Sequence, residues 1–201
     1  MAIHGTPRWN DRDAAYFQQT NNPTEHMLKV RLPHGTSWLE TCGPTAAINC
    51  ITAMGNDVSI YTPGGYLPQP EEVLSDWFND SQNFDLMSHI YSVLSPEEVA
   101  GNEVLDWYPL ALRQVFDVTA HVVSQLSLQD AIAHLNSGRA LLICLKSPGH
   151  YIALVAYDDV TNEFIYQDSW PERWPDGDGF CRRLSWREFE TNRRPKALVF
   201  W

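Results

Sequence analysis

A series of short apolar segments in the second half of the chain constrains the fold more than any other feature. Turns rich in Gly, Pro, Asp and Asn separate these segments, as they do between short strands. The predicted strands cover residues 140–146, 150–159, 163–168, 180–184 and 197–201. Connections this short join antiparallel neighbours, because a parallel pair needs a crossover of about a dozen residues. The second half is therefore predicted to form an antiparallel sheet.

The first half of the chain shows helical periodicity. Apolar residues recur at helical spacing over 43–54, with Pro44 in the first turn and a stop signal at Gly55. Residues 71–116 are predicted as a run of short helices, and Ser127 can cap one more helix. Leading helices followed by a trailing sheet predict a single α+β domain.

The segments around these helices are predicted as follows. Residues 1–26 are polar and turn-rich, and "MLKVRLP" (27–33) is predicted as a short strand. It leads into "HGTSWLET" (34–41), which is predicted as a loop. A second loop is predicted over 61–70, because Pro and Gly are frequent there.

The composition excludes several functional classes. With 201 residues, of which 44% are hydrophobic, the chain can bury a sizeable core without disulfides. Its formal net charge of -11 disfavours binding to nucleic acid, which needs a basic face. No segment approaches the roughly 18 apolar residues of a membrane span, and residues 1–19 lack the apolar core of a signal peptide. We therefore expect a cytoplasmic protein with no nucleic-acid or membrane partner.

The cysteines and histidines give no sign of a metal or redox centre. The four cysteines lie at positions 42, 50, 144 and 181, with no CxxC pair and no metal-finger spacing. Cys42 and Cys50 on one helix would be about 12 Å apart, too far for a disulfide. None of the histidines shows a metal-binding spacing. We expect reduced thiols, no metal and no cofactor.

Cys42 stands immediately before the predicted helix, in the sequence "TCGPTAAINC". The N–H groups and partial positive charge of a helix N-terminus favour the thiolate form of a cysteine. Cys42 is therefore a candidate nucleophile. Taken alone, however, a cysteine before an apolar helix is more simply a small core residue, and Cys50 is interpreted as one.

A histidine and an aspartate later in the chain strengthen the case for catalysis. The strands 150–157 and 163–168 are predicted to form one hairpin, in which Asp168 lies close to His150 across the pair. A carboxylate that holds one imidazole nitrogen leaves the other free to accept a thiol proton. Singly, each of the two is more simply a turn residue. With Cys42 as the nucleophile, His150 is a candidate base and Asp168 a candidate for the group that orients it.

The order of these motifs resembles that of the papain clan of cysteine peptidases. Cys42-Gly43-Pro44-Thr45 opens a helix, Gly149-His150-Tyr151 opens a strand, and Asp168 ends the next strand. Within the clan, the pattern is most similar to the bacteriocin-processing, or double-glycine-leader, peptidases and their relatives. The resemblance spans residues 36–184. It implies a papain-like fold, in which the nucleophile lies on a helix N-terminus packed against a C-terminal antiparallel sheet.

The segment "DSWPERWPDGDGF" (168–180) adds to this resemblance. In papain-like enzymes a Trp that follows the His-orienting residue covers the hydrogen bond between that residue and the His. The resemblance gives this role to Trp170, with Trp174 beside it. Exclusion of water strengthens a partly buried interaction between imidazole and carboxylate. The alternative is that both are hydrophobic residues at the rim of the site.

One element of the family pattern is missing. The family usually places a Gln about six residues before the nucleophile, where its amide joins the nucleophile's backbone N–H in an oxyanion hole. That position is Thr36 in this chain. The substitute donor is expected to be Thr36, Ser37 or Trp38, or else Gln18 or Gln19 from farther away.

The resemblance implies a cysteine peptidase that hydrolyses a peptide, isopeptide or amide bond through a thioester acyl-enzyme. In it Cys42 would attack the carbonyl, His150 would act as base and then acid, and Asp168 would orient His150. Residues 1–35 would form an N-terminal extension, and 61–116 a helical insertion that walls the cleft. The alternatives are a Cys-His-Asp acyltransferase of transglutaminase-like or phytochelatin-synthase-like type, and an impaired papain-like module that binds peptides. The oligomeric state is left open.

Overall fold

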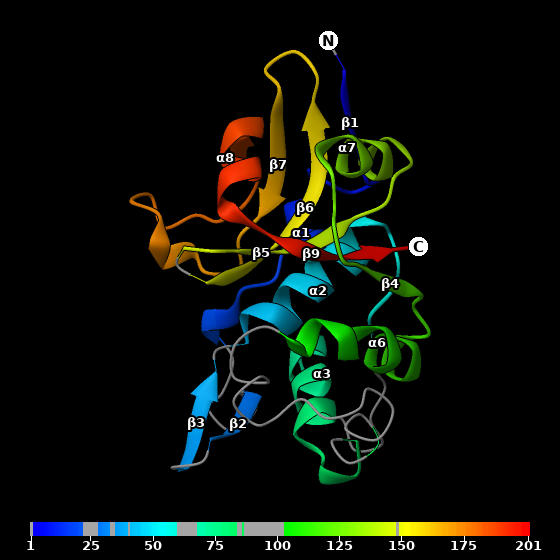
Figure 1. The fold of residues 1–201 in the computed structure, drawn as a ribbon, viewed down its shortest axis with the longest axis vertical. Coiled ribbons are helices and arrows are strands. Elements are labelled where there is room, and N and C mark those ends of the chain that lie inside the picture. The colour runs from blue at the N-terminus through cyan, green and yellow to red at the C-terminus, as the bar shows by residue number, and fades with distance from the viewer. Residues whose placement is uncertain are drawn as a thin grey trace.

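An antiparallel sheet lies at the centre of the structure, a computed structural model (Figure 1). The structure describes residues 2–21, 28–32, 35–39, 41–59, 68–83, 86, 103–147 and 149–201. The described strands of this sheet are β1 (Ile3–Gly5), β4 (Ala120–Val123), β5 (Leu141–Leu145), β6 (His150–Asp158), β7 (Glu163–Gln167), β8 (Arg182–Ser185) and β9 (Arg193–Phe200). They pair in the order β4-β9-β5-β6-β7-β8, and β1 pairs with the C-terminal part of β6.

The described pairings of this sheet are all antiparallel, as the short connections predict. The largest differences from the predicted strands are at the last two. The strand β8 begins at Arg182 instead of 180, because Cys181 has a φ of 50° and interrupts the extended backbone. The last strand, β9, begins at Arg193 instead of 197 and extends to pair with β4 and β5.

Helices cover both faces of the sheet. On one face lie α2 (Cys42–Ala53), α3 (Pro70–Asn79) and α6 (Tyr108–Phe116). On the other face lie α7 (Leu128–Asn136) and α8 (Trp186–Asn192). Side chains alternate along a strand, so Leu142 packs towards the first group of helices while Leu141 and Ile143 pack towards the second. The architecture is α+β, as predicted.

Helix α2 occupies the centre of the larger core. Each of its residues from Gly43 to Ala53 is buried, and the helix packs against β6. A helix with no side facing the solvent is stable only where neighbours surround it. The prediction of a helix over 43–54 is confirmed to within one residue at each end. Its N-terminus, and therefore Cys42, is held rigidly by this packing.

Short elements connect the larger ones. The described ones are α1 (Arg12–Ala15) and the 3-10 turns η1 (Gln19–Asn21), η3 (Glu103–Trp107) and η4 (Pro171–Arg173). Within its described part, the predicted run of short helices over 71–116 contains α3, η3 and α6. Most of the predicted loop at 61–70 lies outside the described residues, and α3 begins at Pro70.

A separate hairpin precedes Cys42 in the chain. Strand β2 (Leu28–Leu32) pairs with β3 (Gly35–Leu39), apart from the main sheet (Figure 1). The predicted strand at 27–33 is confirmed. The predicted loop at 34–41 is wrong over Gly35–Leu39, because the backbone N–H and C=O groups of a strand need partners and the following segment supplies them.

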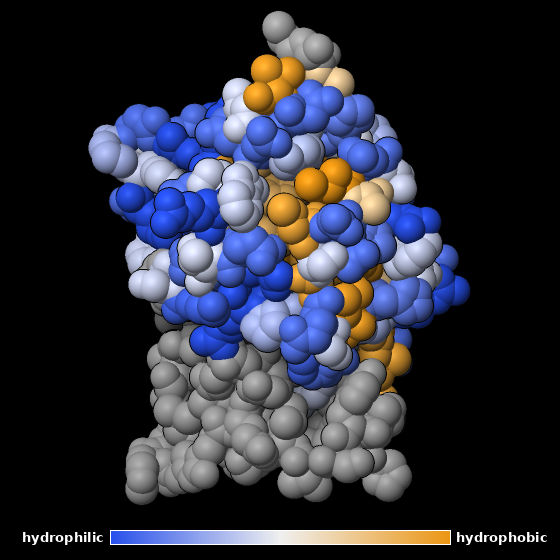
Figure 2. Space-filling view, turned by 45° about the horizontal axis from the view of Figure 1, so that its top comes forward, coloured by the Kyte–Doolittle hydropathy of each residue, from blue (hydrophilic) through white to orange (hydrophobic). Residues whose placement is uncertain are grey.

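The surface of the described part is mainly polar, with a band of apolar residues along the face shown in Figure 2. Large apolar side chains that are individually exposed include Ile3, Val160, Trp186 and Trp201. Among the described residues, no helix has the length and apolar character needed to cross a membrane.

Candidate active site

Cys42 is the first residue of α2, and its thiol is partly exposed although the rest of the helix is buried. The side chain of Thr41, at the N-cap, makes no capping hydrogen bond. The next residue, Gly43, lies against the hydroxyl of the buried Tyr108, and a Cβ added at Gly43 would collide with it. A glycine is therefore required for this close approach.

His150 is the first residue of β6 and is almost fully buried. The preceding Gly149 has a φ of 76°, a conformation that favours glycine. His150 pairs with Leu145 on β5, so the register of the sheet fixes its position. Because α2 packs against β6, the sheet brings this imidazole to the start of the helix that carries Cys42.

Asp168 directly follows β7, the partner of β6 in the hairpin. In that hairpin Ala153 pairs with Gln167, the register expected for a turn near residue 160. The Nε2 nitrogen of His150 donates a hydrogen bond of 2.7 Å to Oδ1 of Asp168. The side chains are 3% and 0% exposed, so water is excluded from this bond.

Other groups of the same loop hold the carboxylate of Asp168. Its Oδ1 also accepts a hydrogen bond of 3.0 Å from the backbone N–H of Trp170. Its Oδ2 accepts one of 3.1 Å from the indole Nε1 of Trp174 and one of 3.3 Å from Arg173. Both oxygens are therefore fixed in direction, and the edge presented to His150 is determined.

These contacts set the charge state of the pair. Burial raises the pKa of Asp168, but the bonds from His150 and Trp170 and the charge of Arg173 outweigh it and hold the pKa below its ordinary value. Burial lowers the pKa of His150, but the hydrogen bond to Asp168 and the interaction with the Cys42 thiol outweigh it and raise the pKa to about 9. At neutral pH the pair is therefore a carboxylate and an imidazolium.

The two ring nitrogens of His150 have different partners. Nε2 is committed to Asp168. The thiol of Cys42 also acts on the imidazole and raises its pKa, and Nδ1 is the ring nitrogen that Asp168 leaves available to it. An imidazolium beside a thiol favours the thiolate. The imidazole of His150 thus interacts with the carboxylate of Asp168 and with the thiol of Cys42.

Both predicted shielding residues contact the pair. The ring of Trp170 packs edge-on against the imidazole of His150, with ring centroids 5.9 Å apart. Trp174 reaches the carboxylate and donates to it, which the sequence analysis did not predict. Arg173 was also missed. The signal available for both was their place within six residues of Asp168, in the same loop.

The predicted oxyanion-hole residues Thr36, Ser37 and Trp38 lie on β3. They pair there with Arg31, Val30 and Lys29 of β2, respectively. Their side chains lie outside the part of the chain that the structure describes, so their roles stay predictions.

Gln19, another candidate donor, contacts Ser169, the residue that follows Asp168. It is buried; its N–H donates to the carbonyl of Ser169, and its Oε1 accepts a hydrogen bond of 2.9 Å from the Ser169 hydroxyl. Two residues earlier, Phe17 is held by the amide side chain of Asn49 on α2. Residues seven apart on a helix lie on the same face, so Asn49 lies on the same face of α2 as Cys42.

The described residues hold no cluster of His, Cys, Asp or Glu that could bind a metal ion. The four thiols are not joined in disulfides. Cys50 and Cys144 are buried, and Cys181 is partly buried. Burial raises the pKa of each of these three thiols.

Comparison with known proteins gives one family. A model described as "Peptidase_C39 like family" matches residues 12–191. Among solved structures, a match is found to a chain described as a candidate C39-like peptidase from Bacillus anthracis, with 11% sequence identity and a TM-score of 0.37. This match covers 48% of the present chain and 58% of that chain. No curated protein matches. The family match includes Cys42, His150 and Asp168.

Proposed function

Because the chain belongs to the Peptidase_C39 like family, we propose that it is a cysteine peptidase in which Cys42 is the nucleophile, His150 the base and acid, and Asp168 the orienting residue. The family supports a peptidase that acts on a peptide or protein. The observation that carries the residue roles is the buried 2.7 Å hydrogen bond between His150 and Asp168, on an imidazole whose pKa the thiol at the start of α2 also raises.

The first half of the reaction uses Cys42 as a thiolate and His150 as an imidazolium. The thiolate of Cys42 attacks the carbonyl carbon of the scissile amide, a C–S bond forms, and the carbonyl electron pair moves to oxygen. The imidazolium of His150 then donates its Nδ1 proton to the leaving nitrogen as the C–N bond breaks. The products of this half are a thioester and a free amine.

The second half regenerates the enzyme. Neutral His150 takes a proton from water, and the water oxygen attacks the thioester carbonyl. The C–S bond breaks and releases the carboxylic acid product together with the thiolate. Asp168 remains a carboxylate throughout and stabilises the imidazolium whenever it forms.

The oxyanion hole requires a donor besides the backbone N–H of Cys42. We assign this role to Gln19. Its Oε1 is committed to the hydroxyl of Ser169, so its amide nitrogen, the donor end, faces away from Ser169. Two residues before Gln19, Phe17 is hydrogen-bonded to Asn49 of α2, the helix that begins at Cys42. These contacts favour Gln19 over Thr36, Ser37 and Trp38.

We also propose a papain-like arrangement, with residues 61–116 walling the cleft. In the described part of that segment, Phe78 of α3 packs on Tyr108 of α6, with ring centroids 4.9 Å apart. Tyr108 in turn lies against Gly43, next to the nucleophile. Both helices are therefore anchored beside Cys42. Because the family description names a peptidase, we place hydrolysis ahead of acyl transfer and of peptide binding without turnover.

The reactivity of the thiols tests the proposed roles. At pH 6 to 7, Cys42 is expected to react with iodoacetamide roughly ten-fold faster than Cys181, which is also partly exposed but has a raised pKa. Replacement of His150 by Ala should remove this advantage. Mass spectrometry of the modified peptides measures both rates. Equal reactivity of the two thiols, or no effect of His150→Ala, would exclude the catalytic assignment.

A second experiment tests the role of Gln19 in the oxyanion hole separately. Gln19→Ala should slow acylation of Cys42 by an activated peptidyl ester by roughly 100-fold, because that step creates an oxyanion. Alkylation by iodoacetamide creates none and should be nearly unchanged in the same variant. If both reactions slow equally, Gln19 supports the fold and the donor must be sought on β3.

A further inference from the structure

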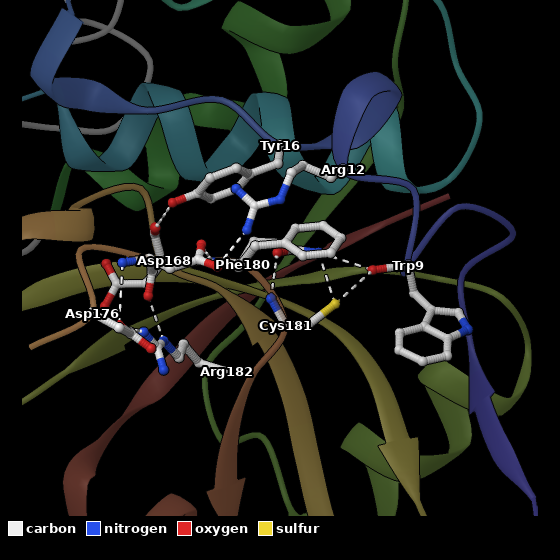
Figure 3. Close-up of polar contacts among 10 residues, drawn as sticks. Trp9, Arg12, Tyr16, Asp168, Asp176, Phe180, Cys181 and Arg182 are labelled. Atoms are coloured by element: carbon white, nitrogen blue, oxygen red, sulfur yellow. Dashed lines mark hydrogen bonds and ion pairs between the residues drawn. The ribbon is translucent and has the colours of Figure 1, made fainter. Parts of the chain in front are cut away.

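Two groups that are distant from Asp168 in sequence hold its main chain (Figure 3). The hydroxyl of Tyr16 donates a hydrogen bond of 2.9 Å to the carbonyl oxygen of Asp168. The N–H of Asp168 donates to the carbonyl oxygen of Gly179, also at 2.9 Å. The rotamers open to a side chain depend on its main chain, so these two bonds bear on the direction of the carboxylate.

Tyr16 belongs to a segment, residues 9–19, that we call the N-terminal clamp. The carbonyl oxygen of its first residue accepts a hydrogen bond of 2.9 Å from the amide of Gln167. The N–H of its last residue donates to the carbonyl oxygen of Ser169, also at 2.9 Å. Asp168 therefore lies between two residues that the clamp holds, and Tyr16 contacts Asp168 itself.

A charged and aromatic contact fastens the middle of the clamp (Figure 3). Arg12 forms an ion pair with Asp178, and its guanidinium lies over the ring of Phe180, 4.7 Å from the centroid. The ring of Tyr16 packs edge-on against the same Phe180, with centroids 5.6 Å apart. These contacts orient the phenol of Tyr16 so that its hydroxyl points at the carbonyl of Asp168.

Gly179 provides the space for this contact. A Cβ added at Gly179 would collide with the carbonyl oxygen of Asp168 and with the hydroxyl of Tyr16. Its φ is outside the left-handed region, so close approach and not backbone conformation explains the glycine. The main chain of Asp168, Gly179 and the phenol of Tyr16 thus form one packed unit.

We propose, on the basis of the catalytic roles proposed above, that Tyr16 is a positioning residue whose hydroxyl holds the main chain of Asp168 so that its carboxylate meets His150. Burial raises the pKa of Tyr16 to about 12, so the hydroxyl stays protonated and remains a donor across the neutral and mildly alkaline range. Tyr16 does not touch His150 or Cys42 in this role. It acts through Asp168.

The test compares Tyr16→Phe with Tyr157→Phe. Tyr157 loses a similar hydrogen bond, 3.0 Å long to Asn162, but at the far end of the β6–β7 hairpin. In Tyr16→Phe, the pKa of His150, measured by NMR titration, should fall below the wild-type value of about 9, because a displaced Asp168 no longer supports the imidazolium. Alkylation of Cys42 by iodoacetamide at pH 8 should slow roughly 10-fold. Tyr157→Phe should leave both quantities unchanged.

Arg12→Gln provides a second variant at the surface, which loses the ion pair with Asp178 and should shift the pKa of His150 in the same direction by a smaller amount. Circular dichroism checks that each variant is folded. A folded Tyr16→Phe protein with the wild-type His150 titration overturns the proposal. If Tyr16→Phe does not fold, an unchanged titration in Arg12→Gln overturns it. If instead wild-type Cys42 proves no more reactive than Cys181, the proposed function fails, while the His150 titration still decides whether Tyr16 positions Asp168.

Discussion

Two buried carboxyl groups of this protein, Asp168 and Glu71, have opposite properties. Neither is accessible to solvent. Asp168 receives hydrogen bonds on both oxygens, and its pKa lies below the ordinary value. Neither carboxyl oxygen of Glu71, in the first turn of α3, has a hydrogen-bond partner among the described residues. Burial raises the pKa of Glu71 to about 7.

The comparison shows that placed donors, not burial, decide whether an interior carboxyl group is charged. Removing a carboxylate from water is costly unless hydrogen bonds replace the lost hydration. Asp168 gains these bonds from Trp170, Arg173 and Trp174, and from His150 across the hairpin. On the buried side of α3, Glu71 is followed by Leu74 and Phe78, which offer no donor, and the hydroxyl of Ser75 donates to the backbone carbonyl of Glu71 instead of its carboxyl group. Of these two groups, the one that keeps its charge is the one that the proposed reaction needs.

The largest expected effect comes from removing the charge of Asp168. Asp168→Asn should slow alkylation of Cys42 at pH 7 on the order of 100-fold. A neutral amide does not stabilise an imidazolium, and its NH₂ group would replace an oxygen that now accepts hydrogen bonds. The pKa of His150 should fall from about 9 towards its ordinary value of 6.5. NMR titration and mass spectrometry measure the two effects.

Asp159→Asn is the matched control for that variant. Asp159 also pairs with a histidine, His4, but the two side chains are 46% and 42% exposed. An exposed pair contributes little, so this variant should behave as wild type. If Asp168→Asn also left the titration of His150 unchanged, the conclusion that Asp168 is a charged group supporting the imidazolium would be wrong.

The second effect concerns stability and comes from Glu71. Its folded-state pKa of about 7 lies above the ordinary 4.5, so the folded state binds this proton more tightly than the unfolded state does. The resulting stability is complete below pH 4.5 and is lost as the pH rises through 7. Glu71→Gln should therefore raise the free energy of unfolding by about 2 kcal/mol at pH 8 and change it little at pH 4.5.

Denaturant titration at the two pH values measures this difference. Glu72→Gln is the control, because Glu72 accepts a hydrogen bond of 3.0 Å from the N–H of Gln69 in the capping box. That variant should be slightly less stable than wild type at pH 8. A gain from Glu71→Gln of the same size at both pH values would show that ionisation is not the cause.

The smallest expected effect comes from removing a single donor to Asp168. Trp174→Phe keeps an aromatic ring but loses the 3.1 Å hydrogen bond to Oδ2. Alkylation of Cys42 at pH 7 should slow roughly 5-fold, the worth of about one hydrogen bond. Trp77→Phe, which loses the indole bond to Gln114 between α3 and α6, is the control. An equal effect in the two variants would mean that the contact with Asp168 has no special role.

Local sequence patterns were sufficient to predict much of the fold. The helix that starts at Cys42 and the hairpin of β6 and β7 follow from apolar spacing and turn residues, because those signals act within a few residues. The loop predicted at 34–41 was wrong because a strand is completed by its partner, and an isolated pattern does not identify the partner. Helix α8 was missed although a capping box at Ser185 and Glu188 marks its start.

The candidate site shows the same division. The order of Cys42, His150 and Asp168 was visible in the sequence, and the hairpin register predicted that the last two lie close together. The contacts of Tyr16 and Gln19 were not predictable in this way, because each joins residues about 150 positions apart and leaves no periodic signal.

The sequence by itself therefore determined which residues are the candidates for nucleophile, base and orienting carboxylate, since these are properties of side chains and of short motifs. Only the tertiary structure decided which carboxyl groups are charged and which hydrogen bonds hold them. The same type of carboxyl group is held below its ordinary pKa at Asp168 and raised to about 7 at Glu71. The physical reason is that the free energy of a buried charge depends on donors brought from other parts of the chain.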